Sequence, residues 1–265
     1  IRPNPSPVKS VVVIGSGNVA EALARALVRN PLYRLAQVFG RNRERTEAVA
    51  SMCGCPFGCL PERPLPADIY LIAVSDRAVA GLSASLDFGE AVVAHTAGSV
   101  ALTELSERIA RRGVFYPLQT FTAGRDIPLD DVPLLIEAED PHTEAELRLL
   151  AEALSRRVLR ATSDQRLRLH LAAVFACNFA NRMFAIGQEL LGEYRLPPDL
   201  LSPLIAETTA KAVQSPSAAA VQTGPARRND TPTMEKHLAL LSGHPELQNL
   251  YQEISLNIWE TSKKI

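Results

Sequence analysis

The 265-residue sequence predicts an α/β fold, a doubly wound parallel sheet, followed by an all-helical C-terminal region. Short apolar runs alternate with amphipathic segments as far as about residue 162, which is the pattern of strand–helix repeats. A glycine-rich turn joins the first of these runs to a helix. Beyond residue 162 no strand pattern recurs. These observations predict two domains, residues 8–162 and 163–265.

The composition is that of an ordinary globular protein, with 46% hydrophobic and 22% charged residues. A net charge of −1 and few aromatic residues argue against a nucleic-acid partner. No uninterrupted apolar run reaches membrane-spanning length, so we expect no membrane partner. The Pro-rich residues 1–7 predict a short disordered lead-in without the apolar core of a signal peptide.

The first predicted strand, 11–14, ends in the sequence G-S-G-N-V-A and a helix follows it. Gly15 permits the sharp turn, Gly17 allows close backbone approach, and Ala20 lets the helix pack near the sheet. The free N–H groups of such a helix N-terminus bind phosphate. The motif therefore predicts a dinucleotide-binding turn made of Gly15, Ser16, Gly17, Asn18 and Val19. An ordinary strand–turn–helix without a ligand is the alternative.

The second predicted strand, 35–39, is followed by Arg41 and Asn42 in place of an acidic residue. An acidic residue at this point binds the ribose 2′-hydroxyl of NAD, whereas a guanidinium can pair with the 2′-phosphate of NADP. We therefore predict NADP as the cofactor, held by Arg41 and Asn42. Alternatively, the arginines at 41, 43 and 45 are the solvated first turn of the helix expected at 43–51.

The following segments continue the alternation. We expect a loop at 56–66, strands at 67–74, 91–94, 114–116, 132–137 and 158–161, and helices at 102–111 and 141–157. A ligand of such a sheet lies at the carboxyl ends of the strands. The residues at or just after the carboxyl ends of three of these strands are therefore candidates, Val74, Ser75, Thr96, Ala97 and Gly98 for the cofactor and Tyr116 and Gln119 for the substrate.

Four helices are expected in the second domain, the first about thirty residues long from residue 164, and the others at 198–214, 231–241 and 245–263. At about 100° per residue, the first helix has one apolar face and one face that carries His170, Cys177, Asn181 and Gln188, with Asn178 nearby. This polar face has few charges. It predicts either the wall of a binding cleft or a packed helix with satisfied polar groups.

Cys53, Cys55 and Cys59 form a C-x-C-x3-C pattern that lacks both a fourth ligand and the usual spacing of a zinc site. We interpret them as reduced thiols of a cytoplasmic protein and predict no metal site.

Six motifs along nearly the whole chain resemble one family, the Rossmann-like proteins with a helical C-terminal domain of the DUF2520 type. They are G-S-G-N-V-A at 15–20, A-V-S-D-R-A at 73–78, H-T-A-G-S at 95–99, Y-P-L-Q-T-F at 116–121, H-L-A-A-V-F-A-C-N-F at 170–179 and T-G-P-A-R-R-N-D at 223–230. The family is related to pyrroline-5-carboxylate reductase, ketopantoate reductase and F420-dependent NADP oxidoreductase. The resemblance implies a Rossmann domain, a helical domain like the C-terminal one of 6-phosphogluconate dehydrogenase, a homodimer through that domain, and an active site between the two domains.

One departure concerns the catalytic Lys that β-hydroxyacid dehydrogenases and ketopantoate reductase carry four residues before an Asn. If Asn178 or Asn181 is that Asn, the Lys position holds Val174 or Cys177. His170 could then supply the proton, with Asn178 or Asn181 orienting the carbonyl, and Arg227 could hold a substrate carboxylate. The expected function is an NADP-dependent reductase of a small carboxylate-bearing carbonyl or imine, with a ketopantoate-like 2-oxo acid first. A non-catalytic NADP-binding or regulatory protein is the alternative.

Overall fold

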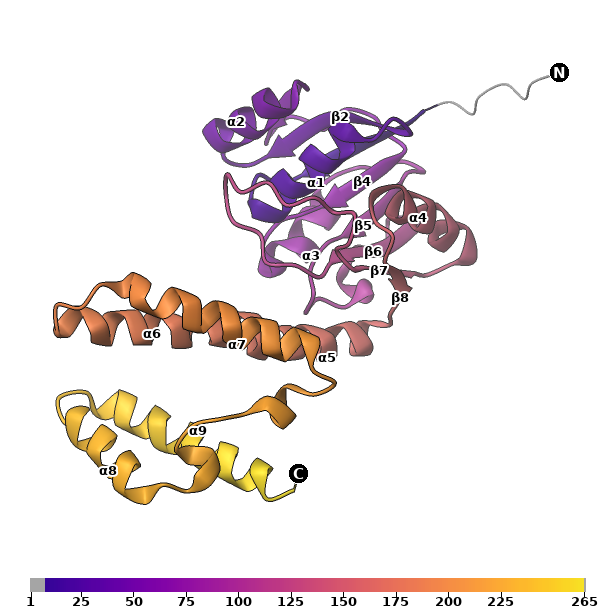
Figure 1. Ribbon diagram of the computed structural model, residues 1–265. Coiled ribbons are helices and arrows are strands. Elements are labelled where there is room, and N and C mark those ends of the chain that lie inside the picture. Colours follow the sequence, from indigo (N-terminus) through magenta and orange to yellow (C-terminus); the bar gives the residue numbers. More distant parts are fainter. Residues whose placement is uncertain (1–7, 265) are drawn as a thin grey trace. The chain divides into compact units, whose positions relative to one another are not determined.

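In the computed structural model, which describes residues 8–264, eight strands form one sheet in the order β3-β2-β1-β4-β5-β6-β7-β8 (Figure 1). The predicted lead-in at residues 1–7 lies outside the described residues. The strands are β1 (Lys9–Ile14), β2 (Tyr33–Gly40), β3 (Phe57–Cys59), β4 (Ile69–Ile72), β5 (Val92–His95), β6 (Arg111–Pro117), β7 (Leu134–Ala138) and β8 (Val158–Arg160). The strand order reverses direction between β1 and β4, which creates a crevice at that point.

Helices cover both faces of the sheet, which confirms the predicted doubly wound α/β class. Successive strand residues point to opposite faces. Val11 and Val13 pack with α1 (Asn18–Arg29), α2 (Arg43–Cys53) and α4 (Pro141–Leu154). Val12 and Ile14 pack on the other side, with α3 (Asp76–Ser85) and the segment after it. The two cores therefore explain why these strands are almost wholly apolar.

The structure differs from the sequence expectations at three places. The helix predicted at 102–111 is wrong, since only a 3-10 turn, η1 (Leu102–Glu104), forms there. The strand β6 begins at Arg111, which pairs with Val92 of β5. The last residue of the expected helix is therefore part of a strand. The loop expected at 56–66 contains the short strand β3. The sheet is mostly parallel, but β6 and β7 pair antiparallel.

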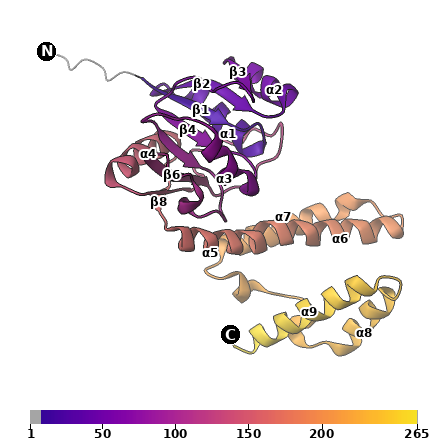
Figure 2. The same ribbon diagram turned by 180° about the vertical axis from the view of Figure 1, so that it is seen from behind.

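The chain divides into two compact units, residues 8–179 and 180–264 of the described part. The predicted boundary at 162/163 marks the end of the sheet, where Thr162 caps α5 (Ser163–Ala173). The first unit also includes α5 and the π-helix η2 (Val174–Phe179). The same helix continues into the second unit as α6 (Ala180–Glu193) (Figure 2).

The π-helix alters the predicted helical wheel. A π-helical turn holds more residues than an α-helical turn, so a spacing of 100° per residue does not hold across η2. The expected alignment of His170 with Asn181 therefore breaks at this segment. The apolar side chains here are also exposed, Phe175 by 63% and Phe179 by 49%.

The second unit is helical throughout its described length, with α6 and α7 side by side and α8 beside α9 (Figures 1 and 2). Its further elements are η3 (Pro198–Leu201), α7 (Ser202–Gln214), η4 (Ala218–Val221), η5 (Ala226–Arg228), α8 (Thr231–Leu240) and α9 (Pro245–Ser262). Between residues 180 and 264 the buried side chains are those of Ala226 and Leu241 alone. This unit thus has almost no core of its own.

One described helix, Ser163–Glu193, is long and apolar enough by length and composition to cross a membrane. Its most apolar 18-residue window has a mean hydropathy of 1.3, and none of that window is buried. The expectation that no segment reaches membrane-spanning length therefore has one exception, and a single helix of this kind is weak evidence for a membrane protein.

Candidate functional site

A cavity of about 1080 Å³ opens at the carboxyl ends of the strands, at the crevice between β1 and β4. This is the size range of small-molecule and cofactor sites. It brings together all the residues predicted to bind a cofactor and three others from the first unit. They are Gly15, Ser16, Gly17, Asn18, Val19, Arg41, Asn42, Val74, Ser75, Thr96, Ala97 and Gly98, with Tyr116, Gln119 and His170.

The glycine-rich turn has the geometry of a phosphate cradle. Gly15 has φ 134°, and a Cβ there would lie 2.0 Å from the carbonyl oxygen of Ala73, so only glycine fits. Gly17 is the N-cap of α1, where no described side chain caps the helix, and a Cβ at Gly17 would meet nothing within 4 Å. The first N–H groups of α1 are therefore open to an anion.

The glycine-rich turn is held by Arg45, which itself pairs with the buried carboxylate of Glu21. Arg45 Nε donates a hydrogen bond to the Ser16 carbonyl oxygen at 3.0 Å, and its guanidinium also pairs with Glu21 at 2.5 Å. Burial of Glu21 would raise the pKa of that carboxyl, but hydrogen bonds from Arg25 and Arg45 lower it on balance. Arg45 is thus occupied in holding the turn and is not a candidate for a bound phosphate.

The three arginines after β2 have separate places. Arg43 lies over the Phe57 ring, 5.1 Å from the centroid. Arg41 is exposed and lines the cavity beside Asn42, whose side chain accepts a hydrogen bond from the Arg45 backbone N–H at 2.9 Å. Arg77, at the start of α3, lines the cavity too and was not predicted. Arg77 belongs to the A-V-S-D-R-A motif at 73–78, of which only Val74 and Ser75 were predicted to bind the cofactor.

Another part of the cavity, called the imidazole end below, is formed by Gly98, Tyr116 and His170, which lie close together. The Tyr116 hydroxyl lies 3.1 Å from His170 Nδ1. Asn18 Nδ2 donates a hydrogen bond to the Phe121 carbonyl oxygen at 2.9 Å, which connects the glycine-rich turn to the loop after β6. His170 reaches the cavity from α5, so the first unit by itself supplies an imidazole at this end.

The other predicted residues lie elsewhere. Asn178 is exposed within η2 and does not line this cavity. Asn181 lies on α6 and Arg227 on η5, both in the second unit. Their roles toward a substrate stay predictions.

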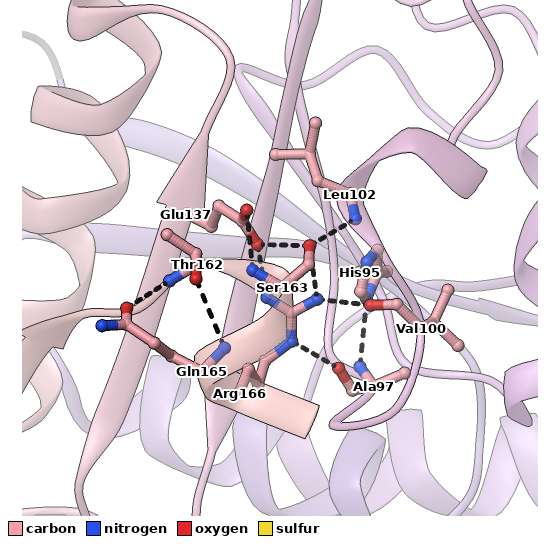
Figure 3. Close-up of polar contacts among 9 residues, drawn as sticks. All are labelled: His95, Ala97, Val100, Leu102, Glu137, Thr162, Ser163, Gln165 and Arg166. Carbon is pink, nitrogen blue, oxygen red and sulfur yellow. Dashed lines mark hydrogen bonds and ion pairs between the residues drawn. The ribbon is translucent and has the colours of Figure 1, made fainter. Parts of the chain in front are cut away.

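A buried polar cluster next to the cavity was not predicted (Figure 3). Arg166 is 1% exposed, forms an ion pair with Glu137 at the end of β7, and donates hydrogen bonds to the carbonyl oxygens of Ala97 and Val100. Ser163 Oγ donates to Glu137 at 2.8 Å and accepts from the Leu102 N–H at 3.0 Å. The cluster holds the H-T-A-G-S loop in place. The one sequence feature that could have indicated this cluster is a charged residue, Glu137, at the end of an otherwise apolar strand.

His95, the last residue of β5, directly precedes the loop residues of this motif and is fully buried. Its Nδ1 accepts a hydrogen bond from the Ala97 N–H at 3.2 Å, whereas Nε2 has no partner among the described residues. Burial, with the nearby Arg166 guanidinium, lowers the pKa of His95 to about 4. This imidazole is therefore neutral at pH 7.

The cysteines form free thiols. Burial raises the pKa of Cys55 to about 11, so that thiol stays protonated at neutral pH. Between residues 8 and 264, no group of three or more His, Cys, Asp or Glu side chains is placed to hold a metal ion.

Comparisons with known proteins agree with this fold. A family model described as "Domain of unknown function (DUF2520)" matches residues 132–258. No curated protein matches the chain. A protein from Bacteroides fragilis that is assigned as an NADP oxidoreductase is 38% identical, with 95% of this chain and 98% of that chain covered and a TM-score of 0.89.

Two more distant structures share the fold. A protein from Thermotoga maritima is 20% identical, with 96% of this chain and 98% of that chain covered and a TM-score of 0.71. A 1-pyrroline-5-carboxylate reductase from Streptococcus pyogenes is 12% identical, with 96% of this chain and all of that chain (100%) covered and a TM-score of 0.62.

Proposed function

The chain belongs to the DUF2520 family of Rossmann-like proteins, and from this premise we propose that it is an NADP-dependent oxidoreductase. The observation that carries the proposal is the cavity of the first unit. It combines an uncapped helix N-terminus behind a glycine-rich turn, an exposed guanidinium at the end of β2, and His170 at the imidazole end. The names of the structural relatives, which include NADP oxidoreductases and reductases, support the same class.

Each part of a dinucleotide would have its own set of residues in the cavity. Gly15 to Val19 would bind the pyrophosphate, while Arg41 and Asn42 would bind the 2′-phosphate. Val74, Ser75 and the backbone of Thr96 to Gly98 would border the ribose and the nicotinamide. Bound NADPH would supply a hydride.

The chain itself would supply the proton. His170 lies at the imidazole end, and an imidazole can donate a proton to a carbonyl or imine as a hydride arrives. Gln119 also lines the cavity and is a candidate substrate contact. The role of Asn178 or Asn181 in orienting the reacting group stays a prediction from the sequence, since neither side chain lines this cavity.

We propose a small carboxylate-bearing substrate, with a ketopantoate-like 2-oxo acid first and a cyclic imine acid second. The carboxylate would need a cation. Arg166 is already paired with Glu137, so it is not available to a substrate. Arg227 is the candidate, because a guanidinium binds a carboxylate with two parallel hydrogen bonds.

One observation favours a second candidate function, a non-catalytic NADP-binding or regulatory protein. The positions four residues before Asn178 and Asn181 are Val174 and Cys177, so the expected Lys is missing from this helix. Such a protein would bind NADPH through the same cavity without turning it over.

Two measurements test the two functions together. NADPH is titrated into the full chain by fluorescence, with NADH as the comparison. Then its oxidation is followed with a panel of 2-oxo acids and cyclic imine acids. Oxidation by a member of the panel supports the oxidoreductase. Tight NADPH binding without oxidation by any of them favours the non-catalytic protein, and no NADPH binding contradicts both.

We further propose that the partner of the second unit is a second copy of the chain. With Ala226 and Leu241 as its buried side chains between residues 180 and 264, this unit cannot be stabilised by its own core. Its exposed apolar residues include Leu204, Val213 and Leu256. Closed homo-oligomers are the commonest soluble assemblies, and a homodimer would bury this surface. A cytoplasmic location stays a prediction.

A further inference from the structure

Tyr116 was predicted to contact the substrate, but its hydroxyl is engaged with a side chain of the protein. It lies 3.1 Å from His170 Nδ1, and the two rings meet edge to face, with centroids 6.2 Å apart and an interplanar angle of 70°. Tyr116 itself is buried near the end of β6, with 9% exposure. The hydroxyl is thus fixed by the sheet and meets the imidazole at one particular ring nitrogen.

Gly98 makes this contact possible. A Cβ at Gly98 would lie 2.6 Å from His170 Nδ1 and 2.9 Å from Tyr116 Cζ, both closer than real Cβ atoms approach their neighbours. The glycine is required here for close packing, since its φ is not in the left-handed region. The Nδ1 edge of the imidazole is therefore enclosed by the Gly98 backbone and the Tyr116 ring.

The loop that contains Gly98 is itself held from α5. Arg166 lies one turn before His170 and donates hydrogen bonds to the carbonyl oxygens of Ala97 and Val100, on either side of Gly98 (Figure 3). The ion pair between Arg166 and Glu137 connects this arrangement to β7. The positions of the Gly98 backbone, Tyr116 and His170 are therefore fixed by contacts within the first unit.

The Tyr116 hydroxyl can keep its hydrogen bond to His170 Nδ1 in either protonation state of the imidazole. Burial raises the pKa of Tyr116, so the phenol keeps its proton at neutral pH. A protonated hydroxyl can donate to an unprotonated Nδ1 and accept from a protonated one. The hydrogen bond therefore survives when the imidazole gains or loses a proton.

We infer that Tyr116 is a positioning residue that holds His170 through Nδ1, so that Nε2 is the nitrogen that serves the substrate, and that Gly98 makes room for this arrangement. The inference rests on the proposed function for the role of His170. It assigns to Tyr116 a role other than the predicted substrate contact. Such fixed orientation matters because a misplacement of about 1 Å can cost about 100-fold in rate.

The test compares Tyr116→Phe with Tyr70→Phe in the full chain. Tyr70 is also a buried tyrosine, and it does not line the cavity. Its hydroxyl donates a hydrogen bond to the Leu65 carbonyl oxygen at 2.9 Å and accepts one from the Ala67 N–H at 3.2 Å. The ring nitrogens of the five histidines are observed by ¹⁵N NMR without substrate, and His170→Ala identifies the signals of His170. Tyr116→Phe should shift the His170 Nδ1 signal, and Tyr70→Phe should not. An unchanged Nδ1 signal in Tyr116→Phe overturns the inference.

Kinetics and a second variant complete the test. Tyr116→Phe should lower kcat by about tenfold with the KM for NADPH unchanged, because the imidazole is still present but less well oriented. A raised substrate KM with unchanged kcat would instead make Tyr116 a substrate contact and overturn the inference. Gly98→Ala should also displace the His170 signals. The NMR result does not depend on turnover. If the protein binds NADPH but does not oxidise it, the proposed reductase activity is contradicted, and the NMR spectra still test the contact between Tyr116 and His170.

Discussion

Arg166 and His170 lie one helical turn apart on α5, and both lie against the loop of residues 97–100. Arg166 holds the carbonyl groups of the loop, while His170 packs over Gly98 between them. The helix α5 is therefore anchored to the sheet by its first turn and brings an imidazole to the cavity with its last. This relationship leads to separate predictions for stability and for activity.

Arg166→Met should destabilise the protein by about 3–5 kcal/mol, because it leaves the Glu137 carboxylate beside a buried site without its partner. Urea unfolding of the full chain measures this. Arg168→Met is the matched control, since Arg168 lies on the same helix in an exposed pair with Asp164 and should leave the urea midpoint unchanged. Equal midpoints for the two variants would show that the buried pair does not stabilise the fold. The double variant with Glu137→Gln should recover part of the loss.

His95 predicts a loss of stability in acid. Its folded pKa, about 4, is below the ordinary 6.5, so protonation favours the unfolded chain. The stabilisation is complete above pH 6.5 and is lost as the pH falls toward 4, and it amounts to about 3 kcal/mol. Urea unfolding at pH 7 and pH 4.5 measures it.

His95→Gln should reduce the pH dependence between these two values. His142→Gln, on exposed His142 of α4, is the control and should behave as the native chain does. If His95→Gln unfolds with the same pH dependence as the native protein, the buried imidazole is not its source.

Arg41→Ala should weaken NADPH binding by roughly tenfold or more, because a hydrogen-bonded charge pair to the 2′-phosphate is lost, while NADH binding changes little. Arg43→Ala is the control, as Arg43 lies over Phe57 and does not line the cavity. Fluorescence titration with both nucleotides gives the two affinities. Equal losses for NADPH and NADH would refute the 2′-phosphate assignment.

His170→Ala should leave NADPH affinity intact and lower kcat by roughly 100-fold or more, the usual contribution of a general acid. His142→Ala is a surface control for the loss of an imidazole. Steady-state kinetics with the best substrate of the panel separates kcat from KM. Unchanged turnover in His170→Ala would remove the imidazole from the mechanism.

Light scattering tests the homodimer. The expected mass is twice the 28.8 kDa of one chain. Leu204→Glu, on a residue that is 63% exposed on α7, should shift the population toward the monomer, because a charge would enter the buried interface. Leu149→Glu is the matched control, because Leu149 lies on α4 of the first unit and is 60% exposed. This variant should leave the proportion of dimer unchanged. A monomeric native chain would contradict the proposal.

Most of the first unit could be predicted from the sequence. β-Branched runs that end at glycine, polar or histidine residues indicated the strands, and the carboxyl ends of those strands gave the residues that line the cavity. Such patterns are local, because the period of the side chains and the turn at Gly15 follow from neighbouring residues. The long helix that starts near residue 164 was evident for the same reason.

Contacts between distant segments form only when the chain packs, and the sequence did not predict them. Residues 102–111 have a helical pattern, but pairing with β5 makes the end of this segment a strand. Arg166, Glu137 and the Ala97 carbonyl oxygen come together from three elements, and nothing local in the sequence links them. The use of the Tyr116 hydroxyl on His170 depends on Gly98 for the same reason. Side-chain partners and burial are properties of the packed chain, which no local pattern encodes.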